Sequence, residues 1–304
     1  MNRLEIPEKK IDVQYPSSWD EIGRKNAGRI GEILYLCYTG KIDYDMARKL
    51  AVDEFLNRVN SPVKPKYGED SMVYWGNESM LADSVNWLFT EVNASPNPFR
   101  GGEKKGSNER GEKVHTDLNP DCTPVFTINP KFCTQLIPYV KVGGIRYEGP
   151  KDLISDLTIY EWKEASWRLS KYAKTLDDRF LDELFVVLYC RGRGSRVLNP
   201  AVQVPIGVKF MTYLFFLGCM NWMREEIIEI DGEEIRFGCL FPTSADPSKG
   251  GAKNDDDHTG LAGIIFQMAE SGVFGNMEQT SKVNMWDVFL RLYQIHHQIK
   301  KLKI

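Results

Sequence analysis

The residue types best suited to holding a metal ion lie together in one polar segment, Asp255-Asp256-Asp257-His258. Carboxylate oxygens and an imidazole nitrogen bind divalent cations, so the run 253–258 suits a metal-dependent hydrolase or nuclease. An EF-hand loop needs acidic groups at alternating positions and a closing Glu, and this run has neither. An acidic, solvated run that caps the following helix explains the same residues more simply. We therefore predict no metal site and keep the metal enzyme as an alternative function.

The four histidines do not form a ligand set in the sequence. His296 and His297 are adjacent, so on a helix their side chains point about 100° apart. Histidines that bind one metal from one helix face stand four residues apart. His297 continues an apolar stripe while His296 points elsewhere, and His115 and His258 fall in two separate polar segments. We predict no functional pair among them.

Three arginines, Arg191, Arg193 and Arg196, lie in the segment RGRGSR and could hold phosphate, because guanidinium groups form paired hydrogen bonds with phosphate oxygens. The segment also follows a predicted helix, where cations offset the helix dipole. The net charge of −3 argues against a protein that coats nucleic acid along its length. We assign the three arginines to a partner-binding surface and keep nucleic-acid binding through them as a second alternative.

Residues for nucleophilic or acid–base catalysis are not arranged in a known pattern. The chain has no GxSxG motif, and its six cysteines include no CxxC pair. Several cysteines lie in apolar runs, which is typical of reduced core residues in a cytoplasmic protein. Glu161 and Glu164 are better explained as a solvated helix face than as a catalytic pair. The sequence predicts no catalytic residue, no cofactor and no small-molecule substrate.

Two glycines bracket a short apolar pair in the segment SGVFG. Gly272 and Gly275 fit no phosphate-loop or dinucleotide-binding pattern, so we predict a structural corner between two helices. Thr280 or Ser281 is expected to cap the second helix. That helix carries an apolar stripe at three- and four-residue spacings.

The remaining elements are predicted from capping signals and apolar periodicity. Ser18 with Glu21 and Thr158 with Glu161 form capping-box patterns, and Asp43 is a helix cap. The expected helices cover residues 18–38, 44–59, 78–92, 158–175, 177–190, 206–224, 261–271 and 282–302. The expected β-hairpins cover 139–147 and 227–237, the latter with Asp231-Gly232 at its turn.

The most apolar segment, residues 204–223, raises the question of a membrane span. It contains Lys209 and Asn221 as well as a proline and two glycines, whereas a spanning helix needs about 20 mostly apolar residues without charge. We therefore predict a buried central helix and no membrane contact. The N-terminal residues have no apolar core of the kind found in a signal peptide.

These observations predict a mainly α fold, with helical hairpins packed around the central apolar helix and one or two small β-hairpins. We expect one composite domain over residues 1–304. A possible subdivision has an N-terminal helical region at 1–92, a flexible loop at 93–124 that is rich in Gly, Pro and charge, and a main helical region at 125–304.

Three segments resemble proteins of the tail-morphogenesis region in prophages of Bacteroidetes-type bacteria. They are YPSSWDEIGRK, DLTIYEWKEASWRLSKYAKTLDDRFLDELFVVLYC and GLAGIIFQMAESGVFGNMEQTSKVNMWDVFLRL, and they include no catalytic motif. The resemblance implies a helical protein that acts in the host cytoplasm during tail assembly, as a tail assembly chaperone or as a minor tail component found in the virion. The loop 93–124 and the hairpin 227–237 are not part of the resemblance.

The resulting functional hypothesis is a non-enzymatic assembly protein that binds other phage tail proteins or a second copy of itself. It would cover an exposed apolar or helical segment of its partner. Aromatic residues on an exposed helix face would anchor that contact. Trp162 and Trp167 are the candidates, because residues five apart on one helix cannot both face the core.

Overall fold

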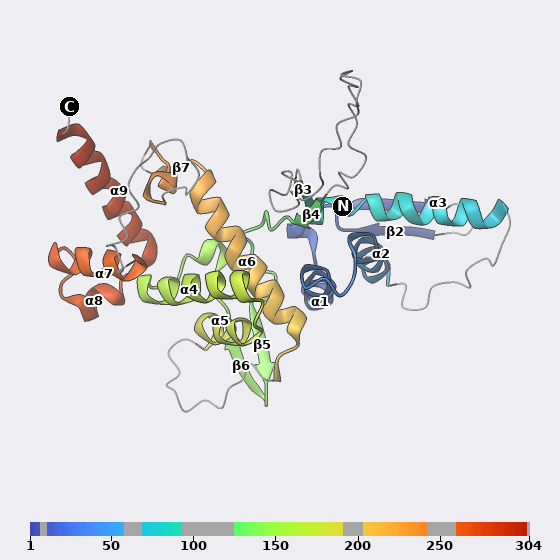
Figure 1. Cartoon of the computed structure of the whole chain (residues 1–304), viewed down its shortest axis with the longest axis horizontal. Coiled ribbons are helices and arrows are strands. Elements are labelled where there is room, and N and C mark those ends of the chain that lie inside the picture. The colour runs from blue at the N-terminus through green and yellow to red at the C-terminus, as the bar shows by residue number, and fades with distance from the viewer. Residues whose placement is uncertain are drawn as a thin grey trace, which may run out of the picture.

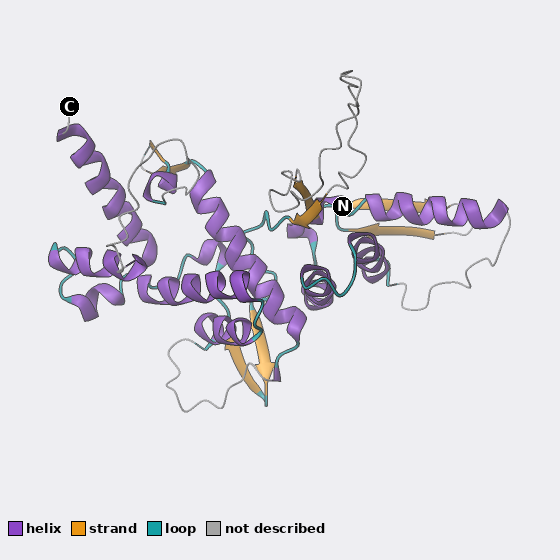
Figure 2. Ribbon diagram, in the orientation of Figure 1, coloured by secondary structure: helices purple, strands orange, loops and turns teal. Residues whose placement is uncertain are grey.

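The protein is mainly α-helical. The computed structural model describes residues 1–6, 11–57, 69–92, 125–190, 203–230, 232–241 and 260–302 (Figures 1 and 2). The helices of this part are α1 (Arg24–Tyr38), α2 (Tyr44–Phe55), α3 (Glu69–Asp83), α4 (Ile159–Thr175), α5 (Arg179–Tyr189), α6 (Ile206–Glu225), α7 (Gly260–Glu270), α8 (Met277–Ser281) and α9 (Met285–Leu302). The predicted fold class is confirmed.

The strands of the described part form four separate two-stranded antiparallel sheets. They pair as β1 (Asn2–Ile6) with β2 (Ile11–Tyr15), β3 (Phe89–Val92) with β4 (Val125–Ile128), β5 (Tyr139–Val142) with β6 (Ile145–Glu148), and β7 (Ile228–Ile230) with β8 (Glu233–Ile235). The two predicted hairpins are β5–β6 and β7–β8. The sheets β1–β2 and β3–β4 were not predicted.

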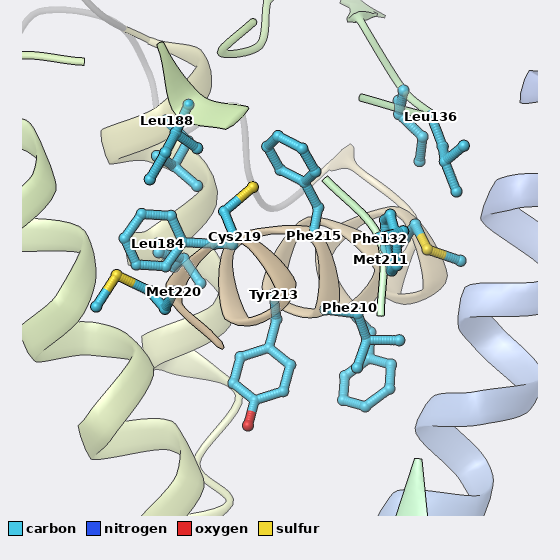
Figure 3. Packing of buried hydrophobic residues seen from close by; sticks show 14 of the residues in the cluster. Phe132, Leu136, Leu184, Leu188, Phe210, Met211, Tyr213, Phe215, Cys219 and Met220 are labelled. Atoms are coloured by element: carbon cyan, nitrogen blue, oxygen red, sulfur yellow. The ribbon is translucent and has the colours of Figure 1, made fainter. Parts of the chain in front are cut away.

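Helix α6 is the central element of the core, as predicted from its composition. Its side chains are buried on every side: Tyr213 and Phe210 point one way and Phe215 and Cys219 point the other (Figure 3). Within the described residues it is the one helix that is long and apolar enough to cross a membrane, but 72% of that apolar window is buried inside the protein. A helix that is apolar all round is buried either in a protein core or in a membrane, and here the other helices and loops cover it.

Two different contacts hold the neighbouring helices on α6. Helix α1 approaches it at glycines, with Gly31 against Gly207, so that the two backbones touch. Helix α5 is joined to it by an ion pair in which Lys209 Nζ lies 2.5 Å from Asp182 Oδ1. Lys209 is almost fully buried, so the carboxylate balances a charge that would otherwise be unfavourable in the core.

The start of α1 differs from the prediction. Ser18 precedes a short 3-10 helix at Trp19–Glu21 but makes no side-chain cap, and α1 begins only at Arg24. Glu21 Oε2 instead accepts hydrogen bonds from the backbone N and the Oγ of Ser17, at 2.7 and 2.8 Å. The predicted capping box is therefore wrong, because the glutamate turns back to the residue before the expected cap. The caps at Asp43 and at Thr158 with Glu161 are confirmed.

The predicted helix at 78–92 is also wrong in its bounds. Helix α3 already begins at Glu69 and ends at Asp83, and β3 occupies Phe89–Val92. The β-prone residues of that strand pair with β4, which lies more than thirty positions later in the chain. The spacing of apolar residues within one segment gives no information about a strand partner that is distant in the chain.

The predicted corner at 272–275 is confirmed, but its helix cap is wrong. Gly272 and Gly275 both have positive φ, at 69° and 85°. Helix α8 follows at once, capped by Asn276, whose Oδ1 accepts a hydrogen bond from Gln279 N at 3.0 Å. Thr280 is fully buried inside α8 and so does not cap the long final helix.

The C-terminal helix α9 is attached to α4 through backbone contacts. Ile159 N donates to Val283 O and Met285 N donates to Leu157 O, both at 2.9 Å. The residues before the two helices therefore form a short antiparallel bridge. This bridge fixes where both helices begin.

One hydrophobic cluster includes described residues from both 1–92 and 125–304. Trp19 stacks on Phe132 with ring centroids 4.6 Å apart, and Trp19 Nε1 donates to Asn129 O at 2.8 Å. The segment 93–124 lies outside the described residues. The single composite domain over 1–304 therefore stays a prediction.

Candidate protein-binding face on helix α4

Helix α4 has a well-defined start, which fixes the directions of its side chains. Thr158 Oγ1 accepts a hydrogen bond from Glu161 N at 3.2 Å, and Glu161 Oε2 accepts one from Thr158 N at 2.9 Å. Such reciprocal bonds satisfy two backbone donors at the first turn. Glu161 is thus a capping residue. Helices α4 and α5 then lie side by side next to α6 (Figure 1).

Trp162 lies on the buried side of α4. It has no exposed surface, its Nε1 donates to Met220 Sδ at 3.0 Å, and its ring meets Phe289 edge-on at 4.9 Å. A side chain enclosed in this way cannot contact a partner without unfolding the helix. The assignment of Trp162 to a partner-binding surface is therefore wrong, and its large apolar ring explains why it is in the core.

Trp167 lies on the opposite side and exposes 47% of its surface. Tyr160 exposes 49% and stands seven residues earlier, which is two helical turns along the same face. The Trp167 ring is supported at its edge by Phe180 of α5, with centroids 5.7 Å apart. The two aromatic side chains therefore form the apolar part of an exposed stripe.

Cations flank both exposed rings. Lys163 Nζ lies 4.8 Å from the centroid of the Tyr160 ring, and Lys171 Nζ lies 5.4 Å from that of the Trp167 ring. Contacts at these distances are attractive because a cation is drawn to the face of an aromatic ring. We define the α4 face as the five side chains on this stripe: Tyr160, Lys163, Trp167, Lys171 and Lys174.

A network of ion pairs runs along the edge of the α4 face. Glu164 contacts Lys163 at 3.1 Å and Arg168 at 2.6 Å, and Arg168 also lies 3.3 Å from Glu183 of α5. Burial tends to raise the pKa of Glu164, but the hydrogen bonds from Arg168 and Lys163 outweigh it and hold that pKa below its ordinary value. Glu164 is thus a charged structural residue.

The other residues singled out in the sequence fall elsewhere. Arg191, Arg193, Arg196 and the acidic segment 253–258 lie outside the described residues. His296 is exposed, and His297 is half-buried, with its ring 4.3 Å from that of Tyr293. Within the described ranges, no three His, Cys, Asp or Glu side chains are grouped as a metal site would require.

The described cysteines are not joined by disulfides. Cys190 and Cys219 are buried, and burial raises the pKa of the Cys219 thiol well above its ordinary value. Cys37 and Cys133 are half-buried, while Cys239 is exposed. The prediction of core cysteines is therefore wrong for Cys239, which lies in a short 3-10 helix after β8.

A cleft of about 400 Å³ lies beside the C-terminal half of α6, and no pattern in the sequence predicted it. Its lining includes Lys131, Trp222, Glu225 and Glu226. The four charged side chains of the lining, Asp20, Lys131, Glu225 and Glu226, are all exposed. A substrate site usually combines an apolar lining with a few enclosed polar groups. The cleft therefore supports no specific chemistry.

Comparison with known proteins adds no further assignment: the chain matches no family model, no curated protein and no solved structure. The geometry of the described residues is therefore the basis for a functional proposal. Two of the predicted site residues, Trp162 and Trp167, lie in the described part of the chain. Of these two, only Trp167 is exposed on the surface. Lys171 and Lys174 were not predicted, although their spacing from Trp167 is the signal that could have found them.

Proposed function

We propose that the chain is a non-enzymatic protein that binds a partner protein through the α4 face, with Trp167 as the main anchor. The carrying observation is the contrast on one helix between fully buried Trp162 and half-exposed Trp167. Tryptophan is enriched among the few residues that dominate interface energies. Support from Phe180 keeps the Trp167 ring ordered, which lowers the entropy lost on binding.

We further propose phage tail assembly as the setting, with a tail protein or a second copy of the chain as the partner. The sequence resemblance to tail-region prophage proteins supports this setting. One of its three segments, residues 156–190, includes the whole α4 face. The protein would act in the host cytoplasm during assembly and would either remain in the particle or be released.

The test is quantitative affinity capture from an induced lysogen that encodes the chain. Tagged wild type is compared with Trp167→Ala and with Phe266→Ala, which removes an exposed aromatic ring from α7 instead. If Trp167 is an anchor worth about 2 kcal/mol, Trp167→Ala lowers partner recovery roughly 30-fold. Phe266→Ala should leave recovery unchanged. Equal recovery with all three proteins would reject the α4 face as the binding surface.

The same experiment separates the two assembly roles. Particles and particle-free lysate are analysed by mass spectrometry. Recovery in purified particles identifies a tail component, whereas recovery only in the lysate with a tail protein identifies an assembly chaperone. Recovery with neither would reject the phage setting. The metal enzyme and the arginine-based nucleic-acid binder depend on residues outside the described part, and no contact of the described residues favours either.

A further inference from the structure

The charge on the α4 face is not balanced. Lys163 is paired with Glu164, and Arg168 is paired with Glu164 and Glu183. Lys171 and Lys174 have no carboxylate partner among the described residues, and Lys171 instead lies over the Trp167 ring. Both lysines are exposed. The C-terminal half of the face thus carries two positive charges that nothing in the described part compensates.

These charges have a fixed relation to the anchor. Lys171 and Lys174 stand four and seven residues after Trp167, so all three lie on one side of α4. Basic residues in the last turns of a helix are also held in a favourable field by the helix dipole. A segment laid along α4 would therefore meet an apolar surface at Trp167 and positive charge just beyond it.

We propose that the element bound by the α4 face is an acidic amphipathic segment of a partner protein. Its carboxylates lie against Lys171 and Lys174, and one of its apolar side chains covers Trp167. This inference rests on the proposed function and adds the chemistry of the partner to it. Charge complementarity of this kind fixes the register of a partner and speeds its association.

The geometry favours a peptide over a single-stranded nucleic acid. Tyr160 and Trp167 are about 10 Å apart along the helix, given a rise of about 1.5 Å per residue, whereas nucleic-acid binders stack successive bases on neighbouring rings. Along the edge of the face, Glu164 and Glu183 are paired with Lys163 and Arg168, so the unbalanced positive charge of the described face is confined to Lys171 and Lys174 at one end. A phosphate backbone that followed the whole stripe would meet uncompensated positive charge only at that end, whereas a short acidic segment needs no more than that.

The test uses the complex captured with the full-length tagged chain. A carbodiimide joins a lysine amine directly to a carboxylate only where the two are in contact, and peptide mass spectrometry then identifies both residues. We expect Lys171 and Lys174 to be linked to Asp or Glu side chains within one partner segment. Lys25, an exposed lysine on α1, should form no link to that segment.

A paired charge reversal gives a second readout. Lys171→Glu/Lys174→Glu is expected to lower partner recovery at least tenfold, and the loss should be smaller at high salt, where charges are screened. The matched control Lys25→Glu/Lys151→Glu makes the same change in net charge on other exposed surfaces and should change recovery less than twofold. An equal loss with the control would overturn the inference.

The outcomes distinguish this inference from the proposed function. If Trp167→Ala releases the partner but neither lysine is linked to it, or the charge reversal has no effect, the acidic-segment inference is wrong and the binding face stands. If Trp167→Ala releases nothing, the binding face itself is wrong. Release of the partner by nuclease treatment, or links from the two lysines only to carboxylates of the same chain, would likewise overturn the inference.

Discussion

Gly31 of α1 and Gly207 of α6 lie backbone against backbone at the point where the two helices cross. A Cβ atom on Gly31 would overlap the carbonyl oxygen of Gly207, and one on Gly207 would overlap the carbonyl oxygen of Gly28. Both residues lie in regular helices, so their backbone conformation does not call for glycine. Glycine is required here because any side chain would overlap the other helix. The close crossing brings α1 directly onto the most buried helix of the fold.

Gly207→Ala should therefore destabilise the protein. Forcing a methyl group into a closely packed contact costs typically about 1–3 kcal/mol, and here backbone atoms would have to move, so we expect at least 2 kcal/mol. The measurement is the free energy of unfolding from denaturant titration. Gly76→Ala in α3 is the matched control, because a Cβ there meets no atom within 4 Å. It should stabilise the protein by about 0.5–1 kcal/mol through its helix propensity. An unchanged stability for Gly207→Ala would contradict the crossing.

The sequence predicted the elements whose signals are local. The caps at Asp43 and Thr158 and the all-round apolar pattern of α6 depend on neighbouring residues only, and these predictions are confirmed. The helix at 78–92 was wrong, because β3 depends on its pairing with β4. The Ser18 side chain makes no cap, and the Glu21 carboxylate bonds to Ser17 instead. The strand was missed because its partner is distant in the chain, and the capping box was wrongly predicted because a second serine one position earlier offered Glu21 an alternative local partner.

The candidate site was predictable only in part. Five-residue spacing showed that one of Trp162 and Trp167 must face outward, but not which. The choice depends on Met220 and Phe289, which come from other helices and enclose Trp162. The importance of Lys171 and Lys174 also depends on which carboxylates lie nearby in space. The spacing of residues along α4 therefore predicts which side chains share a face. Which of the faces is exposed is decided by the packing of α4 against other helices.

Two buried tyrosines give opposite predictions for the same substitution. Tyr172 is fully buried and its hydroxyl has no hydrogen-bond partner among the described residues, whereas the Tyr189 hydroxyl donates to Ile137 O at 2.6 Å. Removing an unpaired buried hydroxyl should help, so Tyr172→Phe is expected to stabilise by about 1 kcal/mol. Tyr189→Phe should destabilise by about 1 kcal/mol or more. Thermal and denaturant unfolding measure both, and a loss of stability in Tyr172→Phe would contradict the prediction.

Alkaline pH should destabilise the protein through Tyr35. Burial, followed by its hydrogen bond to Asp178, raises the pKa of Tyr35 to about 12. An unfolded tyrosine has a pKa of about 10, so the folded state holds this proton more tightly. The associated stability is present below pH 10 and is lost as the pH rises toward 12. Tyr35→Phe should lose less stability over this window than wild type, as followed by unfolding titrations. Parallel curves would exclude Tyr35 as a source of the effect.

Leu176 ends α4 in a conformation that favours glycine. Its φ of 54° and ψ of 25° place it in the left-handed region, and its side chain is 47% exposed. A non-glycine residue there costs about 1–2 kcal/mol, so Leu176→Gly should stabilise by about 1 kcal/mol after the lost apolar contact is subtracted. Ser170→Gly, an exposed position inside α4, should instead destabilise by about 0.5–1 kcal/mol. The free energy of unfolding tests both, and equal effects would contradict the cap.

The two tryptophans of α4 should differ sharply in their effect on stability. Trp162→Ala removes a fully buried ring and should cost about 3–5 kcal/mol. If that variant does not fold, Trp162→Phe gives a milder test, since it removes the contact from Nε1 to Met220 Sδ. Trp167→Ala loses mainly the edge contact with Phe180 and should cost about 1 kcal/mol or less. Unfolding titrations measure all three variants.

This contrast decides how partner capture is interpreted. A folded Trp167→Ala protein that no longer holds its partner has lost an interface contact, because its core is intact. A Trp162 variant that no longer holds the partner has lost the core packing that keeps α4 in place. If Trp167→Ala proved as destabilising as Trp162→Ala, the loss of capture would report unfolding, and Trp167 would have to be reassigned from the interface to the core.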